Sequence, residues 1–190
     1  MASYVVEARS YRLGIWSHNF WVLRDETLKC TLAELHGLAT SRVTGRIVPI
    51  GTTSEHGLRA YVFAHEEAYA ARLGIKVKPT SMFGESPAHP VYEGADGLDR
   101  WQAATAAIPL LNEQDLDYPP WGFNFFGQTV NSNSAYRTFA EIMDIDVYEF
   151  PDVVGPGMRN RMLTLEQTAQ LRFQPRGADL AKARSNSFGV

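Results

Sequence analysis

The chain has 190 residues, of which 45% are hydrophobic and 21% are charged, and its formal net charge is −3. This length allows one domain with a substantial buried core, so we expect a single domain over 1–190. The acidic balance and the lack of a basic stripe argue against a nucleic-acid-binding protein. No apolar run approaches the roughly 18 residues that a membrane-spanning helix needs.

The start of the chain and its metal-binding residue types exclude further classes. The stretch 1–11 lacks the apolar core of a signal peptide, so we expect a cytoplasmic protein or one delivered by a non-classical secretion route. The single cysteine, Cys30, excludes an internal disulfide and a cysteine-based zinc site. The five histidines form no HxxxH or HExxH pair, and we therefore expect neither a metal nor a cofactor.

The first half of the chain predicts strands. The segment 10–23 is rich in aromatic and β-branched residues and reads as one strand, and the polar break at 25–27 predicts a hairpin of 18–24 with 29–36. If paired positions sum to about 54, His18 faces His36 across the hairpin, and Glu34 lies on the same face because side chains alternate. A slip of one residue would move His18 away from His36.

The rest of the chain predicts short elements separated by irregular stretches. The expected strands are 46–50, 58–63, 75–77 and 146–150, and the remainder of 75–91 is expected to be irregular. The expected helices are 65–73 ended by Gly74, 98–108 ended or kinked by Pro109, and one from the capping box at Thr164 to about Phe173. The tail 175–190 is expected to be loose or dependent on a partner.

A stretch late in the chain, 127–139, predicts a helix with a chemically useful start. Ala135 and Phe139 begin an apolar face that continues through the next turn. Asn131 is a good N-cap, and it would place Ser132 in the first turn, where free N–H groups and the helix dipole favour negative charge. A nucleophile or an anion would be stabilised there. The alternative is that Asn131 and its neighbours simply cap a core helix.

These pieces suggest nucleophilic catalysis. A serine hydroxyl needs a base to remove its proton, and histidine suits that role near neutral pH. His18 would act as the base on Ser132, and His36 or Glu34 would orient the His18 ring. Backbone N–H groups around Ser132 would form an oxyanion hole.

Three further residues are candidates for the oxyanion hole or for substrate binding: Gln128, Asn131 and Trp121. Trp121 belongs to the Pro- and Gly-rich aromatic segment 116–127, which we expect to be irregular. That segment would form a pocket wall or fill the core. For the strand histidines, the simpler interpretation is that they are structural residues with satisfied hydrogen bonds.

Three motifs together resemble those of the circularly permuted papain-like hydrolases. They are Ser17-His18-Asn19-Phe20-Trp21, then Glu34 and His36 on the hairpin return, then Asn131-Ser132-Asn133-Ser134. The group includes lecithin-retinol-acyltransferase-like enzymes and permuted cell-wall peptidase-like proteins. The resemblance spans roughly 14–145, and it implies an α+β fold with an antiparallel sheet packed against helices in permuted order.

The resemblance implies a hydrolase or acyl-transfer enzyme, with Ser132 as nucleophile and His18 as base. An amide bond in a cell-wall peptide is the implied substrate, in a bacterial effector or toxin that has an inhibitor or immunity protein as partner. Phospholipid or another ester is the alternative substrate. A different class of answer is a catalytically silent binding domain of the same fold.

Ser132 stands where this family usually has cysteine, in a motif Asn-Cys-Asn/Glu-His/Ser-Phe. Three explanations are open: a natural serine version, a cysteine that has been replaced, or a pseudoenzyme that kept the fold. Serine is far less ionised than cysteine near pH 7, so a dyad adapted to a thiolate works poorly with it unless the geometry of the base differs. Cys30 lies on the hairpin far from His36 and is a poor substitute nucleophile.

Overall fold

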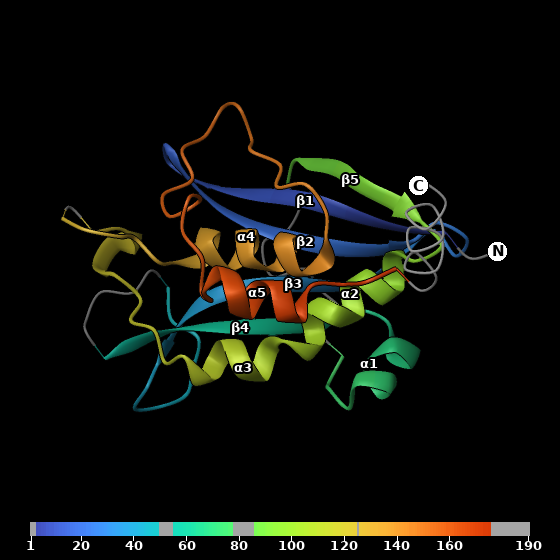
Figure 1. Ribbon diagram of the computed structural model, residues 1–190, viewed down its shortest axis with the longest axis horizontal. Helices are drawn as coiled ribbons and strands as arrows, with labels where there is room; N and C mark the ends of the chain where they lie inside the picture. Colours follow the sequence, from blue (N-terminus) through green and yellow to red (C-terminus); the bar gives the residue numbers. More distant parts are fainter. Residues whose placement is uncertain (1–2, 50–54, 78–85, 125, 176–190) are drawn as a thin grey trace, which may run out of the picture.

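The computed structural model describes residues 3–49, 55–77, 86–124 and 126–175. Within them, antiparallel strands form a five-stranded sheet in the order β4-β3-β2-β1-β5 (Figure 1). The strands are β1 (Tyr4–Leu13), β2 (Trp16–Asp25), β3 (Cys30–Ser41), β4 (His56–Ala64) and β5 (Ala88–Gly94).

Helices cover one face of this sheet, and α4 lies centrally across β2 and β3 (Figure 1). Helix α2 packs on α4 and β1, α3 packs on β4, and α5 packs on α4. The helices are α1 (Glu67–Leu73), α2 (Gly97–Ala106), α3 (Ile108–Glu113), α4 (Ser132–Met143) and α5 (Leu165–Leu171), with a 3-10 turn η1 (Pro120–Gly122). The expected α+β class with an antiparallel sheet packed against helices is therefore confirmed.

The core lies between α4 and the sheet. Nearly all residues of β2 and β3 are buried, so these two strands do not show the alternation of buried and exposed side chains that is typical of a sheet with one face in solvent. Trp21 stacks on Tyr136 with ring centroids 4.3 Å apart and donates its indole N–H to the Tyr136 carbonyl at 2.8 Å. Leu23, Ala33 and Leu35 are fully buried on the same face. As the alternation of side chains along the hairpin predicts, these residues lie on the opposite face of the sheet from His18.

The predicted hairpin is present, but its register differs from the expected one. Val22 pairs with Glu34 and Trp21 with Leu35, which displaces β3 by two residues from the register that would set His18 opposite His36. Because side chains alternate with a period of two, a shift of two residues keeps them on the same face. His18 and His36 are therefore diagonal neighbours, and their rings still meet.

Several sequence-based predictions of elements are wrong. The segment 10–23 is two strands, because Gly14 adopts a left-handed backbone (φ +67°) and turns the chain between β1 and β2. The stretch expected to be irregular up to Val91 contains the first residues of β5, an edge strand that pairs with β1 beside a bulge and tolerates Pro90. Residues 146–150 form no strand in the described chain. Of the strand expected over 46–50, the described residues 46–49 contribute a single bridge, from Ile47 to Thr40, and residue 50 lies outside the described chain.

Other boundaries agree with expectation. Helix α1 ends at Gly74 in the left-handed conformation, and α5 begins with a capping box at Thr164. The helix expected over 98–108 is α2, which ends before Pro109; α3, which has Pro109 in its first turn, was not predicted. Val77 makes a single bridge to Ala64. The tail beyond 175 lies outside the described residues.

Candidate active site

The first turn of α4 presents Ser132 at a capped helix N-terminus. The Asn131 side chain accepts from the Asn133 N–H at 2.9 Å, and Ser134 accepts from the Asn131 N–H at 3.2 Å, which completes a capping box. Ser132 is the first helical residue, as the sequence predicts. The positive end of the helix dipole therefore lies at its hydroxyl.

Glu34, His36 and His18 form a continuous buried chain of hydrogen bonds. Glu34 Oε2 lies 2.9 Å from His36 Nε2, and His36 Nδ1 lies 3.0 Å from His18 Nε2. The two rings are parallel, with an interplanar angle of 1°. The other carboxylate oxygen of Glu34 lies 3.2 Å from Nε2 of His65. The sequence left His36 and Glu34 as alternative orienting residues, whereas the structure places them in series.

The chain of bonds determines where the protons lie when Glu34 is ionised and both rings are neutral. An ionised carboxylate only accepts, so His36 Nε2 carries a proton and donates it. His36 Nδ1 then accepts from the N–H at His18 Nε2. His18 Nδ1 consequently keeps its lone pair and has the form of a general base.

Burial keeps His18 in this neutral form. The loss of hydration lowers the pKa of His18 well below the ordinary value of 6.5. The neighbouring His36 lowers the pKa further, and the negative charge of Glu34 opposes both effects. Near pH 7 the imidazole is therefore unprotonated and able to accept a proton.

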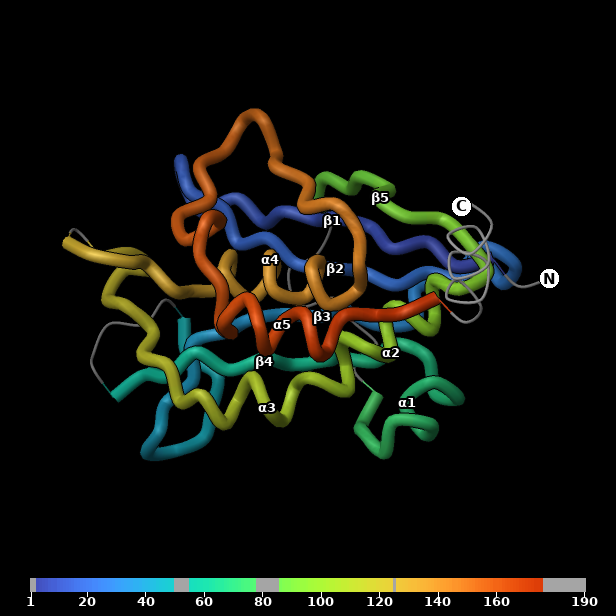
Figure 2. The backbone as a smooth tube through the Cα atoms, viewed as in Figure 1, coloured from blue at the N-terminus to red at the C-terminus, as the bar shows by residue number. Residues whose placement is uncertain are grey.

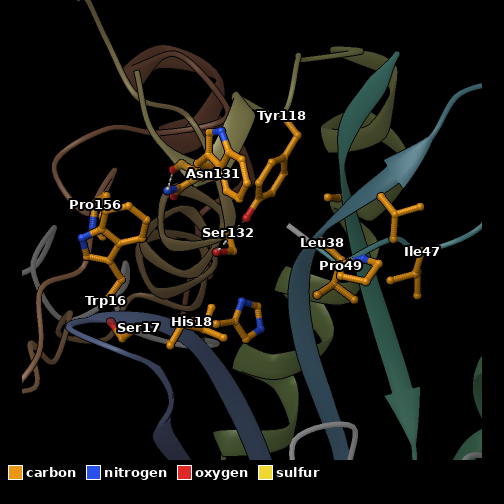
Figure 3. Close-up of a pocket in the computed structure, with 15 residues that line it drawn as sticks. Trp16, Ser17, His18, Leu38, Ile47, Pro49, Tyr118, Asn131, Ser132 and Pro156 are labelled. Carbon is orange, nitrogen blue, oxygen red and sulfur yellow. Dashed lines mark hydrogen bonds between the residues drawn. The ribbon is translucent and has the colours of Figure 1, made fainter. Parts of the chain in front are cut away.

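His18 and Ser132 line the same cavity, which has a volume of about 470 Å³ (Figure 3). Figure 3 shows the Tyr118 hydroxyl directed toward Ser132, and His18 among the side chains that line the same cavity. Its walls are mainly apolar, and the aliphatic and proline side chains that line it include Leu13, Leu38, Ala39, Ile47, Val48 and Pro49. The cavity thus joins a small polar centre to an apolar interior, which is typical of a ligand-binding pocket.

Tyr118 adds a second hydroxyl beside the serine. Its phenol oxygen lies 3.5 Å from Ser132 Oγ and also faces the Ser132 backbone amide. Burial raises the pKa of Tyr118, and its bonds to Ser132 lower it only in part, so the phenol keeps its proton. Its backbone is fixed to the start of β4, because the Tyr118 N–H donates to the His56 carbonyl at 2.9 Å.

Asn133 ties the first turn of α4 to the strand that carries His18. Its side-chain oxygen accepts from the Asn19 N–H at 3.0 Å, and its nitrogen donates to the carbonyls of Ser17 and Pro156, each at 3.0 Å. These bonds flank His18 on both sides. A buried amide with all these bonds satisfied positions β2 against α4 rigidly.

Gly37 lets α4 approach β3 immediately after His36. A Cβ built at this position would lie 2.3 Å from Ala135 Cβ and 3.3 Å from Ser132 Cα. Any larger residue would displace the first turn of α4 or the strand. The residue that follows His36 therefore helps to set how closely the Ser132 turn of α4 packs against β3.

The other sequence-based candidates occupy different positions. Asn131 and Trp121 line the cavity, and the Asn131 amide also donates to the Gly122 carbonyl. Gln128 is exposed and is not among the residues lining the cavity. Cys30 pairs with Asp25 at the far end of the hairpin. In the described part of the chain, no group of three or more His, Cys, Asp or Glu side chains could hold a metal ion.

Sequence reasoning missed Tyr118, Asn133, Trp16 and Gly37 as site residues. Asn133 lay within the nucleophile motif, but nothing local shows that its amide reaches β2, more than a hundred positions earlier. Tyr118 was visible only as part of an aromatic, proline-rich segment. Its role depends on where that segment meets β4.

Comparisons with known proteins identify no relative of this chain. No protein-family model matches the chain, and no curated protein or solved structure matches it either. Among the helices that the structure describes, none is long and apolar enough to cross a membrane.

Proposed function

We propose that this chain is a serine-dependent hydrolase or acyl-transfer enzyme with a permuted papain-like fold. The observation that carries the proposal is the hydrogen-bonded chain Glu34–His36–His18, which ends in the cavity that also holds Ser132. The order of elements supports the fold assignment, because a strand carrying the histidine comes early and a helix presenting the serine comes late.

The proposed reaction begins with attack of Ser132 Oγ on a carbonyl carbon, while the hydroxyl proton passes to His18 Nδ1. His36 and Glu34 stabilise the imidazolium that forms. The backbone N–H of Ser132 and the Tyr118 hydroxyl donate to the oxyanion of the tetrahedral intermediate. This intermediate collapses as the leaving group takes the proton from His18, and an acyl-enzyme remains.

The second half of the reaction releases the acyl group. Water, or another hydroxyl or amine, gives a proton to His18 and attacks the acyl carbon. The proton then returns to Ser132 Oγ as the new product leaves. Water as acceptor gives hydrolysis, and another acceptor gives acyl transfer.

The apolar walls favour a substrate with an apolar acyl part over a polar cell-wall peptide. Leu38, Ile47 and Val48 offer no partner to the charged and amide groups of such a peptide, whose burial without hydrogen bonds is costly. An ester of an apolar acid is therefore the substrate class that the pocket supports best. The effector or toxin role and the inhibitor partner follow from the resemblance alone and stay predictions.

The test is covalent labelling with a long-chain fluorophosphonate, followed by peptide mapping. In this reaction Ser132 Oγ displaces fluoride from phosphorus. We expect labelling at Ser132 and hydrolysis of p-nitrophenyl octanoate, both abolished by Ser132→Ala and by His18→Ala. Ser10→Ala, a buried serine on β1 that does not line the cavity, should retain both.

Two outcomes would change the proposal. Activity that appears only in Ser132→Cys would identify an inactivated cysteine hydrolase. A folded wild-type chain that neither reacts with the probe nor cleaves the ester would favour the binding domain instead.

A further inference from the structure

Two aromatic rings lie against His36, the middle member of the hydrogen-bonded chain Glu34–His36–His18. The strands β2, β3 and β4 run side by side (Figure 2). Phe20 follows His18 by two positions on β2 and therefore lies on the same face of the sheet, and Phe63 of β4 pairs with Glu34 of β3. The ring centroids of Phe20 and Phe63 are 4.5 Å and 5.5 Å from the centroid of His36. Each strand that flanks β3 therefore places a phenyl ring in contact with this imidazole.

The rings of His36 and His18 share one plane, and Phe20 is stacked on it. The two imidazole centroids are 5.4 Å apart while their nearest nitrogens are 3.0 Å apart, and the ring planes differ by 1°, so the imidazoles lie edge to edge. The Phe20 ring is inclined by 20° to the plane of His18 and by 21° to the plane of His36. A centroid separation of 4.5 Å is too short for an edge-to-edge pair, so the face of Phe20 covers His36.

This arrangement stabilises a positive charge on His36 more than one on His18. The face of a phenyl ring is negative and attracts a cation within about 6 Å of its centroid. The centroid of Phe20 is 4.5 Å from His36 and 5.8 Å from His18, so a charge on His36 gains more. Glu34 bonds directly to His36 and reaches His18 only through it. Phe20, Glu34 and His36 are almost fully buried, so little solvent screens these attractions.

We propose that Phe20 is a positioning residue that holds the positive charge of the reaction on His36. When His18 Nδ1 takes the proton of Ser132 Oγ, the N–H bond at His18 Nε2 breaks and an N–H bond forms at His36 Nδ1. His18 is then neutral again with its proton on Nδ1, and His36 is an imidazolium between Glu34 and Phe20. The reverse shift makes His18 a donor to the leaving group. This inference rests on the proposed function, in which Ser132 supplies the proton.

The first experiment weakens the negative face of the Phe20 ring while nearly keeping its shape. Phenylalanines that carry one, two or three fluorines are introduced at this position, because each fluorine withdraws electron density from the face. We expect kcat for p-nitrophenyl octanoate to fall stepwise, by about 2- to 30-fold over the series. KM should stay unchanged, because Phe20 does not line the cavity. The same series at Phe139, a fully buried ring in the core under α4, is the matched control and should retain kcat.

The second experiment locates the charge. Octyl boronic acid forms a tetrahedral adduct with a reactive serine, whose proton passes to the base. A neutral imidazole keeps one nitrogen without a proton, whereas an imidazolium has protons on both. Nitrogen NMR of ring-labelled histidines in the adduct should therefore show both nitrogens of His36 protonated and Nε2 of His18 unprotonated.

The outcomes separate this inference from the proposed function. A positive charge on His18 in the adduct would overturn the inference, as would equal kcat values across the fluorinated series at Phe20. Both results would leave the boronate adduct, and with it the proposed function, intact. Absence of the adduct from the folded wild-type chain would overturn the proposed function and the proton shift together.

Discussion

Gly37 lies against Ala135 so closely that a Cβ at Gly37 would approach the Ala135 Cβ to 2.3 Å. Gly37→Ala should therefore destabilise the fold by about 1–3 kcal/mol, the usual cost of overpacking a core. It should also slow fluorophosphonate labelling of Ser132, because the start of α4 must shift. Urea unfolding and labelling rates measure the two effects.

Gly57→Ala is the matched control for this prediction, since Gly57 lies on the neighbouring strand and a Cβ there would make ordinary contacts at 3.5 Å. It should be tolerated. Equal stability and labelling of the Gly37→Ala variant would show that α4 does not depend on this close approach.

Stability and activity should both fall as the pH falls, because His18 is buried as a neutral ring. Its folded pKa is lowered well below 6.5, whereas the unfolded chain binds a proton near that value. The unfolded state therefore holds more protons below about pH 6.5, and stability is lost as the pH falls from about 7 to 5. In the proposed reaction the same deprotonated ring is the base, so kcat/KM should rise through the His18 pKa and be level near neutrality.

Urea midpoints and kcat/KM across this range test the pH dependence, with His18→Gln as the comparison. That variant should show a weaker loss of stability on acidification. An activity profile that rises only above pH 7 would contradict a base with a lowered pKa.

Glu34→Gln should reduce kcat by about 10²–10⁴-fold, as expected when an orienting carboxylate is replaced by an amide. A glutamine amide can donate to His36 Nε2, which would reverse the direction of the hydrogen bonds and place a proton on His18 Nδ1. KM should change little, because Glu34 does not line the cavity.

His65→Gln removes the imidazole that lies beside Glu34 Oε1 and should have a much smaller effect on kcat, since His65 is not in the path to His18. Similar losses in the two variants would mean that Glu34 acts through general burial of charge and not by fixing the tautomer.

Tyr118→Phe should lower kcat by about 10²–10³-fold, the typical cost of losing one donor to an oxyanion. The affinity for an octyl boronic acid, whose adduct with Ser132 mimics the tetrahedral intermediate, should fall in parallel, while KM stays close to the wild-type value. Tyr136→Phe removes the hydroxyl of another buried tyrosine, which donates to the Tyr148 carbonyl away from the pocket, and should retain kcat. A fall in kcat without a fall in boronate affinity would assign Tyr118 a structural role.

Local chemistry accounts for the features that the sequence predicts correctly. Asn131 caps a helix at Ser132 because its side chain reaches backbone groups only two positions away. Alternation along β2 and β3 places His18, Glu34 and His36 on one face, and this assignment survives a displacement of two residues. The edge strand β5 was not predicted, because Pro90 is a residue that usually argues against a strand and because its partner β1 lies far away in the sequence.

The sequence by itself therefore determined the start of α4, the hairpin and the class of the fold, because capping and alternation depend on near neighbours. Three features were decided only by the tertiary structure. They are the hydrogen bonds that connect Glu34, His36 and His18 in that order, the position of Tyr118 beside Ser132, and the attachment of β2 to α4 through Asn133. These contacts depend on strand register and on the close approach of α4 at Gly37, where long-range packing sets positions that no short stretch of sequence specifies.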